Sequence, residues 1–362
     1  DPHGEYSTLK LENDDYDQML TYNIRPRSYE NQIMEYAANT LVNPGAEKLT
    51  LKPRFSLKEL IDIMPLRLNE NQKSILYTAF KRFRDREYTI QQLIDAVQME
   101  GGKARWKVIN GLEELRNSGL FEGTPLLEKD IVKDGQLTIM NLKGASPEIQ
   151  ELIVAEVARF LFEAIKVGRI PPFLLIIEEA HNFCPERGFG VATSSHILRT
   201  IASEGRKFGL YLCVVSQRPA KVDKNIISQS NTQIILKMTN PNDLNAIGKS
   251  IEGFTPGMES DIRELSVGQA LVVGECVEQP IVVNVRVRET KHAGARTTEE
   301  KEKIEERKPS TLDKIKPIFI EEKVKETTEK PVETKPRLKK KKSIRGRLKS
   351  VFIREKDEPE SK

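Results

Sequence analysis

The sequence predicts an α/β fold, in which a mostly parallel sheet is flanked by helices and carries an inserted helical subdomain and a disordered C-terminal tail. Two observations predict the sheet: short apolar runs rich in β-branched residues begin near Gln136, and helical patterns of roughly ten or more residues separate them. A stretch with only helical periodicity precedes these runs, and a charged stretch without apolar periodicity follows them.

Residues 48–123 are predicted to form the helical subdomain. Apolar residues within 57–64 fall roughly on one helical face, and those within 75–83 fall on another. Glycine and proline residues interrupt the stretch at 101–102 and 123–125. The pattern indicates a group of helices inserted into the α/β core.

The predicted core strands are four apolar runs, at 137–142, 173–177, 210–215 and 233–236. Helices are expected between them, near 147–167, 191–207 and 241–250. Strands that are buried on both faces and alternate with helices indicate a parallel, doubly wound sheet. Residues 270–273 and 280–287 are expected to add late strands, with an antiparallel edge as one option.

Beyond about Glu289 the sequence is dominated by Lys, Glu, Thr and Pro, which bury too little apolar surface to offset chain entropy. Residues 290–362 are therefore predicted to be largely disordered. Between Lys335 and Arg354 there are ten Lys or Arg and no Asp or Glu, and the apolar residues would share one helical face. Three interpretations stay open for this stretch: contact with DNA phosphates, a solvated tail, or a membrane-surface helix.

The overall composition excludes several classes of protein. Lys and Arg number 58 against 54 Asp and Glu, and a net charge of +4 does not by itself argue for nucleic acid. Cys184, Cys213 and Cys276 are widely separated, so neither a zinc site nor a disulfide framework is expected. No apolar run approaches the ~20 residues that span a bilayer, and no signal-peptide pattern is present, so we expect a cytoplasmic protein without a membrane partner.

The most informative run is 173–181 (FLLIIEEAH), an apolar strand that ends in Glu178 and Glu179. Open α/β folds bind ligands at the carboxyl edge of the sheet, where these carboxylates would lie. This is the geometry of a Walker B strand, in which one carboxylate holds the Mg²⁺ shell and the next orients the attacking water for phosphoryl transfer. The alternative is a buried strand followed by a solvated acidic turn.

Two further segments fit the same chemistry. Gln217 follows the strand predicted at 210–215, where a polar amide can sense the γ-phosphate; an ordinary turn residue is the alternative. Arg206 and Lys207 end the helix predicted at 191–207, where the helix dipole favours cations by ~0.3–1 kcal/mol. The functional interpretation of Arg206 is an arginine finger that reaches a neighbouring subunit's γ-phosphate.

A phosphate-binding loop is missing from the sequence. Gly248-Lys249-Ser250 resembles the end of a Walker A loop, but position 243 is Asp where the pattern needs Gly. The tripeptide also lies on a predicted helix, whereas a Walker A loop opens a helix after a strand. The chain starts at Asp1, in a polar turn that normally follows a strand, so we expect it to be a C-terminal piece of a longer polypeptide.

Four segments in order resemble the HerA family of hexameric DNA translocases, in the HerA/FtsK branch of RecA-like ATPases. They are residues 1–6 (DPHGEY), 175–183 (LIIEEAHNF), 203–209 (SEGRKFG) and 215–219 (VSQRP), followed by QSNT at 229–232. The resemblance covers roughly residues 1–292. It implies a RecA-like ATPase and helicase that uses ATP and Mg²⁺, forms a homo-hexamer around double-stranded DNA, and works with a NurA-type nuclease in resecting DNA ends for double-strand-break repair in archaea.

The resemblance also implies roles for single residues. Glu178 would hold Mg²⁺ through water, Glu179 would polarise the attacking water, Arg206 would act in trans and Gln217 would sense the nucleotide. Further residues of the nucleotide site would be Asp1, His3 and Lys207. Without a Walker A loop, the isolated chain is expected to be inactive.

On this basis four domains are expected: residues 1–47 begin the ATPase core, 48–123 form the helical insertion, 124–289 complete the core with Walker B, and 290–362 form the tail. Two other functions stay open. One is a conjugation- or secretion-type ATPase that pumps DNA or protein at a membrane. The other is a non-catalytic structural subunit.

Overall fold

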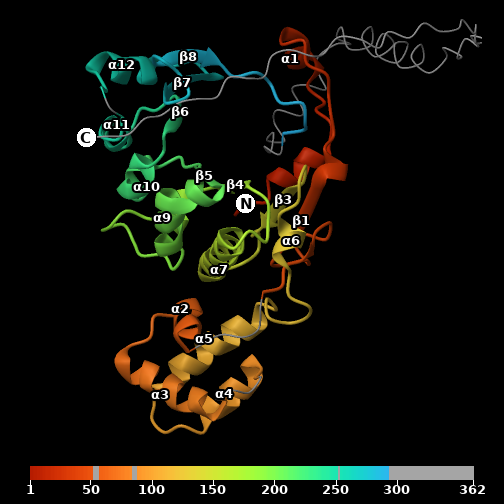
Figure 1. Cartoon of the computed structure of the whole chain (residues 1–362), viewed down its shortest axis with the longest axis vertical. Coiled ribbons are helices and arrows are strands. Elements are labelled where there is room, and N and C mark those ends of the chain that lie inside the picture. The colour runs from red at the N-terminus through yellow and green to blue at the C-terminus, as the bar shows by residue number, and fades with distance from the viewer. Residues whose placement is uncertain (52–56, 84–87, 252, 293–362) are drawn as a thin grey trace, which may run out of the picture. The chain divides into compact units, whose positions relative to one another are not determined.

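The computed structural model describes residues 1–51, 57–83, 88–251 and 253–292 (Figure 1). The chain falls into two compact units, residues 1–296 and 297–362. The second unit lies outside the described residues, as does the predicted disordered tail from residue 293 onward. The first unit combines helices with parallel and antiparallel strands, which confirms the predicted α/β class.

Three strands from the first half of the chain form a parallel sheet. β1 (Ile33–Ala37) lies between β2 (Glu47–Lys48) and β3 (Leu137–Asn141) and pairs in parallel with both. The apolar pattern predicts β3 but misses β1, because Glu35 stands in the middle of that strand. Before β1 the chain forms short helices: η1 (Tyr6–Lys10), α1 (Tyr16–Thr21) and η2 (Glu30–Gln32).

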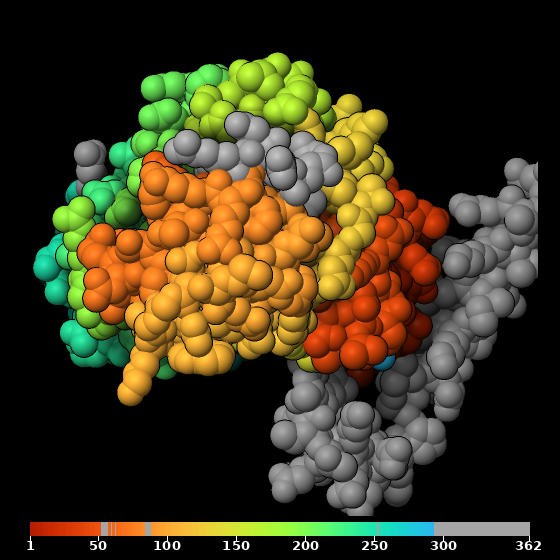
Figure 2. Space-filling model, turned by 90° about the horizontal axis from the view of Figure 1, so that it is seen from below, coloured from red at the N-terminus to blue at the C-terminus, as the bar shows by residue number. Residues whose placement is uncertain are grey.

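The predicted helical insertion lies between β2 and β3. Its helices are α2 (Leu57–Ile63), α3 (Glu70–Phe80), η3 (Lys81–Phe83), α4 (Ile90–Gln98) and α5 (Arg105–Asn117), drawn in orange in Figure 2. Capping boxes start α3 and α4: Asn69 and Thr89 each accept the backbone N–H three residues later, and the glutamine at that position accepts the cap's own N–H.

The second parallel pair is β4 (Phe173–Ile177) and β5 (Leu210–Val214), in register from Phe173 opposite Leu210 to Ile177 opposite Val214. The elements around them are α6 (Glu128–Ile131), α7 (Pro147–Lys166), α8 (Ala180–Phe183), α9 (Ser195–Glu204) and η4 (Gly205–Phe208). Ser146 caps the long helix α7 by accepting the N–H of Ile149. Both strands match the predicted runs closely because every residue in them is apolar.

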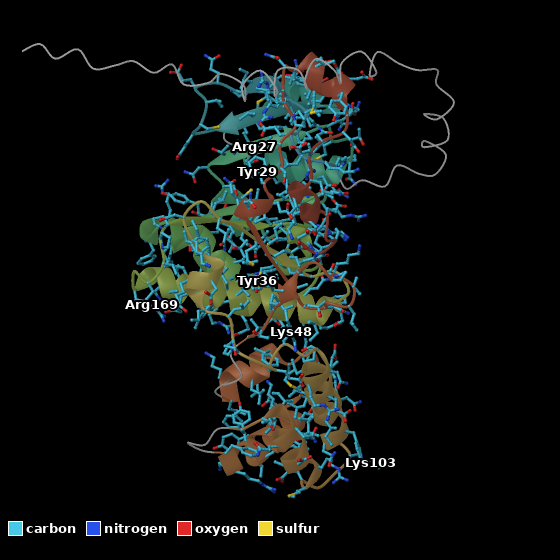
Figure 3. All side chains as sticks on the ribbon, turned by 90° about the vertical axis from the view of Figure 1, so that its right-hand side faces the viewer. Arg27, Tyr29, Tyr36, Lys48, Lys103 and Arg169 are labelled. Atoms are coloured by element: carbon cyan, nitrogen blue, oxygen red, sulfur yellow. The ribbon has the colours of Figure 1, made fainter. Side chains whose placement is uncertain are left out.

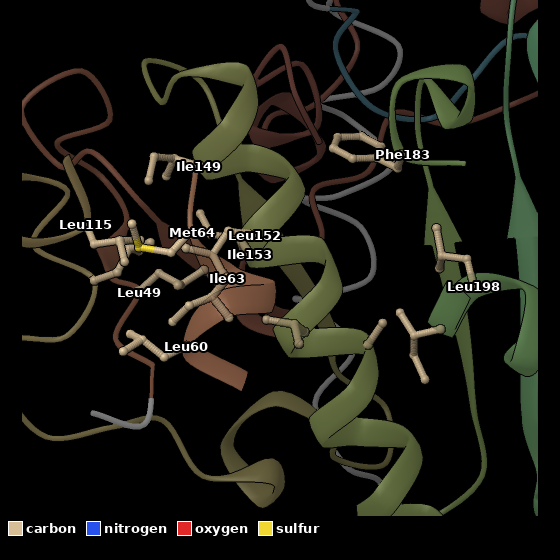
Figure 4. Packing of buried hydrophobic residues seen from close by; sticks show 14 of the residues in the cluster. Leu49, Leu60, Ile63, Met64, Leu115, Ile149, Leu152, Ile153, Phe183 and Leu198 are labelled. Atoms are coloured by element: carbon tan, nitrogen blue, oxygen red, sulfur yellow. The ribbon is translucent and has the colours of Figure 1, made fainter. Parts of the chain in front are cut away.

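One face of the β4–β5 pair packs against a continuous hydrophobic core. Phe173, Leu175 and Ile177 of β4 belong to this core or pack against it, together with buried residues of α7 and α9. The same cluster includes residues of the helical insertion, and Figure 4 shows Ile63 and Met64 of that insertion beside Leu152 and Ile153 of α7.

The other face of the β4–β5 pair is open to solvent. Leu174 is 57% exposed, Ile176 is 48% exposed and Tyr211, opposite Leu174, is 51% exposed. Parallel sheets are normally covered on both faces. The described residues thus cover only one face of this pair and leave an apolar face without a packing partner.

The last strands correct the expectation of a parallel strand at 233–236. β6 (Thr232–Leu236) pairs antiparallel with β7 (Gln269–Gly274), and β7 pairs antiparallel with β8 (Ile281–Asn284), so only the antiparallel option for the late strands is confirmed. The reason lies in the connection, since α11 (Pro241–Gly248) and α12 (Pro256–Glu264) pack together on one face in a second small core and return the chain to the end of β6. Between β5 and β6 lie η5 (Pro219–Lys221) and α10 (Lys224–Ser228).

None of the helices in the described ranges combines the length and the apolar character that a bilayer span requires.

Candidate active site

The candidate site lies where β4 and β5 end. Glu178 and Glu179 directly follow β4. The strand pairing continues past the last strand residues, because Val215 donates its N–H to Ile177 O at 2.9 Å and Ala180 donates to Val215 O at 2.9 Å. This ladder holds both carboxylates at the carboxyl edge of the sheet, where open α/β folds bind ligands.

Glu179 has a strained backbone. Its φ of 49° and ψ of 44° lie in the left-handed region, which non-glycine residues rarely adopt. Its side chain is 14% exposed, and its buried Oε2 has no hydrogen-bond partner among the described residues. The nearest cationic candidate, Nδ1 of His181, lies 3.1 Å from Oε2 without the direction that a hydrogen bond needs.

His181 links the ends of the two strands. Its Nδ1 also lies 3.0 Å from Oγ of Ser216, which itself accepts the backbone N–H of Arg218 at 3.0 Å. Burial lowers the pKa of His181 and outweighs the opposing effect of Glu179. The imidazole is therefore neutral near pH 7. Gln217 follows Ser216 and is exposed at the same edge.

Glu178 has a partner from the start of the chain. The hydroxyl of Tyr6 donates to Oε1 of Glu178 across 172 residues of sequence. Burial raises the pKa of Tyr6, and the adjacent carboxylate of Glu178 raises it further. The phenol consequently keeps its proton and acts as a donor over the whole physiological range.

The side chain of Asp1 organises the turn that carries Tyr6. Its carboxylate accepts the backbone N–H groups of His3 at 3.2 Å, Gly4 at 2.9 Å and Tyr6 at 3.0 Å. The carbonyl of Asp1 accepts the N–H of Leu142 at 2.9 Å, which ties the turn to the end of β3. His3 is exposed. Contacts of Asp1 and His3 with a nucleotide stay a prediction.

A buried polar cluster fixes the rest of η1, which begins at Tyr6, to the first sheet. Glu35 of β1 accepts hydrogen bonds from Ser7 at 2.6 Å, Lys10 at 2.7 Å and the side chain of Asn141 at 2.9 Å. Burial alone would raise the pKa of Glu35, but these three donors outweigh it and lower the pKa. Two carboxylates thus accept hydrogen bonds from η1: Glu35 from Ser7 and Lys10, and Glu178 from Tyr6.

Arg206 and Lys207 do not join the carboxylates. Both are exposed in η4, which precedes β5, whereas Glu178, Glu179 and Gln217 follow their strands. The five residues of β5 span about 16 Å at ~3.3 Å per residue. Within one chain the sheet therefore brings Glu178, Glu179 and Gln217 together and leaves Arg206 at the opposite edge.

The Walker A look-alike is part of a helix end. Gly248 is the last residue of α11 and Lys249 its C-cap, so the tripeptide does not open a helix. Its position agrees with the interpretation from sequence.

The carboxylates at this edge have the chemistry that Mg²⁺ requires of a protein. In the described part of the chain no group of three or more His, Cys, Asp or Glu is placed to hold a metal by itself. Mg²⁺ typically needs only one or two carboxylates, with waters and substrate phosphates as its other ligands. Glu178 could supply such a carboxylate, and the unpartnered Oε2 of Glu179 is suited to accept a proton from water.

Sequence reasoning missed three residues of this arrangement: Tyr6, His181 and Ser216. Each lies within a quoted motif, and Ser216 directly precedes the candidate Gln217. The signal was therefore present in the motifs, but the contacts join segments far apart in the chain and no periodicity reveals them.

The comparisons with known proteins point to one family. Residues 1–161 match the family model described as the helicase HerA central domain. The DNA double-strand break repair helicase HerA of Sulfurisphaera tokodaii is 27% identical over 308 residues, 76% of this chain and 60% of that protein. The namesake in Saccharolobus solfataricus is 29% identical over 332 residues, 84% of this chain and 62% of that protein. The chain thus spans about 60% of the length of these relatives.

A solved structure supports the fold. VirB4 of Thermoanaerobacter pseudethanolicus aligns with a TM-score of 0.52 at 15% identity, over 71% of this chain and 82% of that one. At this identity the likeness concerns the fold only. The ordered motifs, the matched central domain and the curated relatives agree, and together they support membership of the HerA family.

Proposed function

We propose that this chain is the catalytic part of an ATP-driven hexameric translocase or helicase that acts in the cytoplasm on double-stranded DNA, in end resection and double-strand-break repair. The observation that carries the proposal is the pair Glu178 and Glu179 at the carboxyl edge of β4 and β5. Glu179 supports it most directly, because a strained backbone and a buried oxygen without a hydrogen-bond partner are costly features that cluster at active sites.

In this proposal each residue has a defined task. Glu179 orients a water molecule and accepts its proton, while Glu178 would hold the hydrated metal. Bound Mg²⁺ would neutralise charge that develops on the phosphates. Gln217, on the neighbouring strand, senses the nucleotide.

The position of Arg206 supports an assembly in which subunits form a ring. It lies at the sheet edge opposite Glu179, too far to serve the same chain's site, yet it is exposed and free to reach a neighbour. An arginine supplied in trans stabilises charge in the transition state, as in other phosphoryl-transfer enzymes. A homo-hexamer on duplex DNA and a NurA-type nuclease partner belong to the proposal on the strength of family membership.

The open apolar face of β4 and β5 supports the proposal that a further structural element packs there. Leu174, Ile176 and Tyr211 form an apolar face that a strand and helix bearing Walker A would cover. We propose that the complete protein carries this element upstream of Asp1.

The test is ATP hydrolysis with and without duplex DNA by a version extended upstream through a Walker A segment, compared with Glu179→Gln in that version and with the present chain. We expect DNA-stimulated hydrolysis by the extended version only, and a loss of at least about 100-fold with Glu179→Gln, the scale of removing a catalytic acid–base. An extended version that is inert with and without DNA would refute the motor function and favour the structural-subunit alternative.

A further inference from the structure

We infer that Tyr6 is a positioning residue for Glu178: its hydroxyl fixes the carboxylate in the orientation that the metal site requires. The inference rests on the proposed function and adds to it a residue from a different segment. The observation behind it is the hydrogen bond from Tyr6 to Oε1 of Glu178 at the carboxyl edge.

The turn that carries Tyr6 is held from both ends. Asp1 accepts the backbone N–H of Tyr6 itself at 3.0 Å, and Leu142 bonds to the carbonyl of Asp1 at 2.9 Å. On the far side of Tyr6, Ser7 and Lys10 bond to buried Glu35 at 2.6 Å and 2.7 Å. The position of the phenol is therefore set by the first parallel sheet and does not depend on Glu178.

A fixed donor restricts the carboxylate to one rotamer. The hydrogen bond occupies Oε1 of Glu178, with the phenol as the donor and the carboxylate as the acceptor. Residues that hold metal-binding carboxylates in this way affect metal affinity without touching the metal. Through this bond the position of residues 1–10 determines the orientation of the Glu178 carboxylate.

The chain offers a matched control in Tyr29. Its hydroxyl also donates to a carboxylate, Glu289, at 2.5 Å, and its backbone N–H bonds to Leu9 of the same turn. Figure 3 shows Tyr29 beside Arg27, whose guanidinium lies 4.7 Å from the centre of the Tyr29 ring. Tyr29→Phe thus removes a similar bond near η1 without reaching Glu178.

The first measurement concerns the contact and needs no catalysis. Thermal midpoints of the present chain are compared for Tyr6→Phe, Glu178→Gln and both together. We expect Tyr6→Phe to lower the midpoint by about 2 °C when Glu178 is intact and to have almost no effect when Glu178→Gln is present, since coupled residues are not additive. Tyr29→Phe should cause the same shift with or without Glu178→Gln. If Tyr6→Phe lowers the midpoint by the same amount with and without Glu178→Gln, the contact between Tyr6 and Glu178 is refuted.

The second measurement concerns the metal. In the extended version, the Mg²⁺ concentration that gives half-maximal ATP hydrolysis is expected to rise about 10-fold with Tyr6→Phe, the lower end of the usual effect of such partner residues. Tyr29→Phe should leave it within twofold. If Tyr6→Phe also stays within twofold while Glu178→Gln abolishes hydrolysis, the positioning role is wrong and the proposed function stands. If the extended version is inert throughout, the proposed function fails and the role of Tyr6 fails with it.

Discussion

Glu179 combines a proposed catalytic side chain with an unfavourable backbone. Two non-glycine residues have positive φ among the described ones, Asn23 at 50° and Glu179 at 49°. Asparagine tolerates this region, whereas for glutamate it costs of order 1 kcal/mol or more. The strain is consistent with a position selected for chemistry at the expense of stability.

This leads to a stability prediction. Glu179→Gly should raise the free energy of unfolding by about 1 kcal/mol, because glycine adopts the left-handed region freely and the buried, unpartnered Oε2 is removed. Urea denaturation of the present chain would measure it. Asn23→Gly serves as the control and should change stability little, since asparagine already suits its φ. A destabilised Glu179→Gly would mean that packing of the Glu179 side chain outweighs the backbone strain.

Glu35 makes the first sheet sensitive to acid. Its pKa is lowered in the folded chain, so its contribution to stability is complete above the unfolded pKa of ~4.3 and is lost as the pH falls through the lower folded value. Glu35→Gln should cost about 1.5–3 kcal/mol at pH 7, as expected for hydrogen bonds to a charged group. The difference from the unmodified chain should shrink when unfolding is measured below pH 4. The exposed Glu70, which pairs with Lys73, gives a control in which Glu70→Gln has little effect at either pH.

How much of the site the sequence predicts depends on the range of each contact. Glu178, Glu179 and Gln217 follow apolar strands, so strand periodicity places them at one edge. The bonds of Tyr6 to Glu178 and of His181 to Ser216 join separate segments, and one sequence contains no signal of that pairing. Glu35 interrupts the apolar pattern that would predict β1. It nevertheless lies within the strand, because its carboxylate accepts a hydrogen bond from the buried side chain of Asn141.

The connection between α9 and β5 depends on a glycine. A Cβ on Gly205 would lie 2.7 Å from the carbonyl oxygen of Leu210, so only glycine allows η4 to approach the start of the strand this closely. The requirement is steric, since the φ of Gly205 is an ordinary −53°. Arg206 follows directly in η4, so the same close contact fixes the turn that carries it.

Gly205→Ala should accordingly lower the free energy of unfolding by about 1–3 kcal/mol, the usual cost of overpacking. Gly257 of α12 is the control, because its Cβ would meet nothing closer than Oγ1 of Thr255 at 3.7 Å. Gly257→Ala is expected to leave stability unchanged or to raise it by up to about 1 kcal/mol through helix propensity. Thermal or urea unfolding of both variants decides the comparison, and a neutral Gly205→Ala would show that the turn can relax.

Strand direction is harder to predict than strand position. β4 and β5 have the expected bounds and orientation because apolar runs joined by long helices favour parallel pairing. β6 has a similar apolar run, yet the helices after it pack on one side and bring β7 back in the opposite direction. Composition identifies such a strand, and only its connection determines its orientation.

The first unit has a core on one side of β4 and β5 and an uncovered apolar face on the other. Leu174 and Ile176 point to the open face, while Leu175 between them packs against the core. This asymmetry follows from the alternation of side chains along a strand. It also provides a test of whether an upstream Walker A element packs there.

We expect Leu174→Thr together with Ile176→Thr to change the free energy of unfolding of the present chain by less than about 0.5 kcal/mol, as is usual for exposed positions. In the version extended upstream, the same pair should cost about 3 kcal/mol or more, because each side chain would then lose about 1.5–3 kcal/mol of burial. Leu175→Thr, on the covered face, should destabilise both versions equally. Urea denaturation of the four variant proteins measures all of these differences. Equal effects of the double substitution in the short and extended versions would mean that the upstream element packs elsewhere, and the proposed position of the Walker A element on the open face of β4 and β5 would then be wrong.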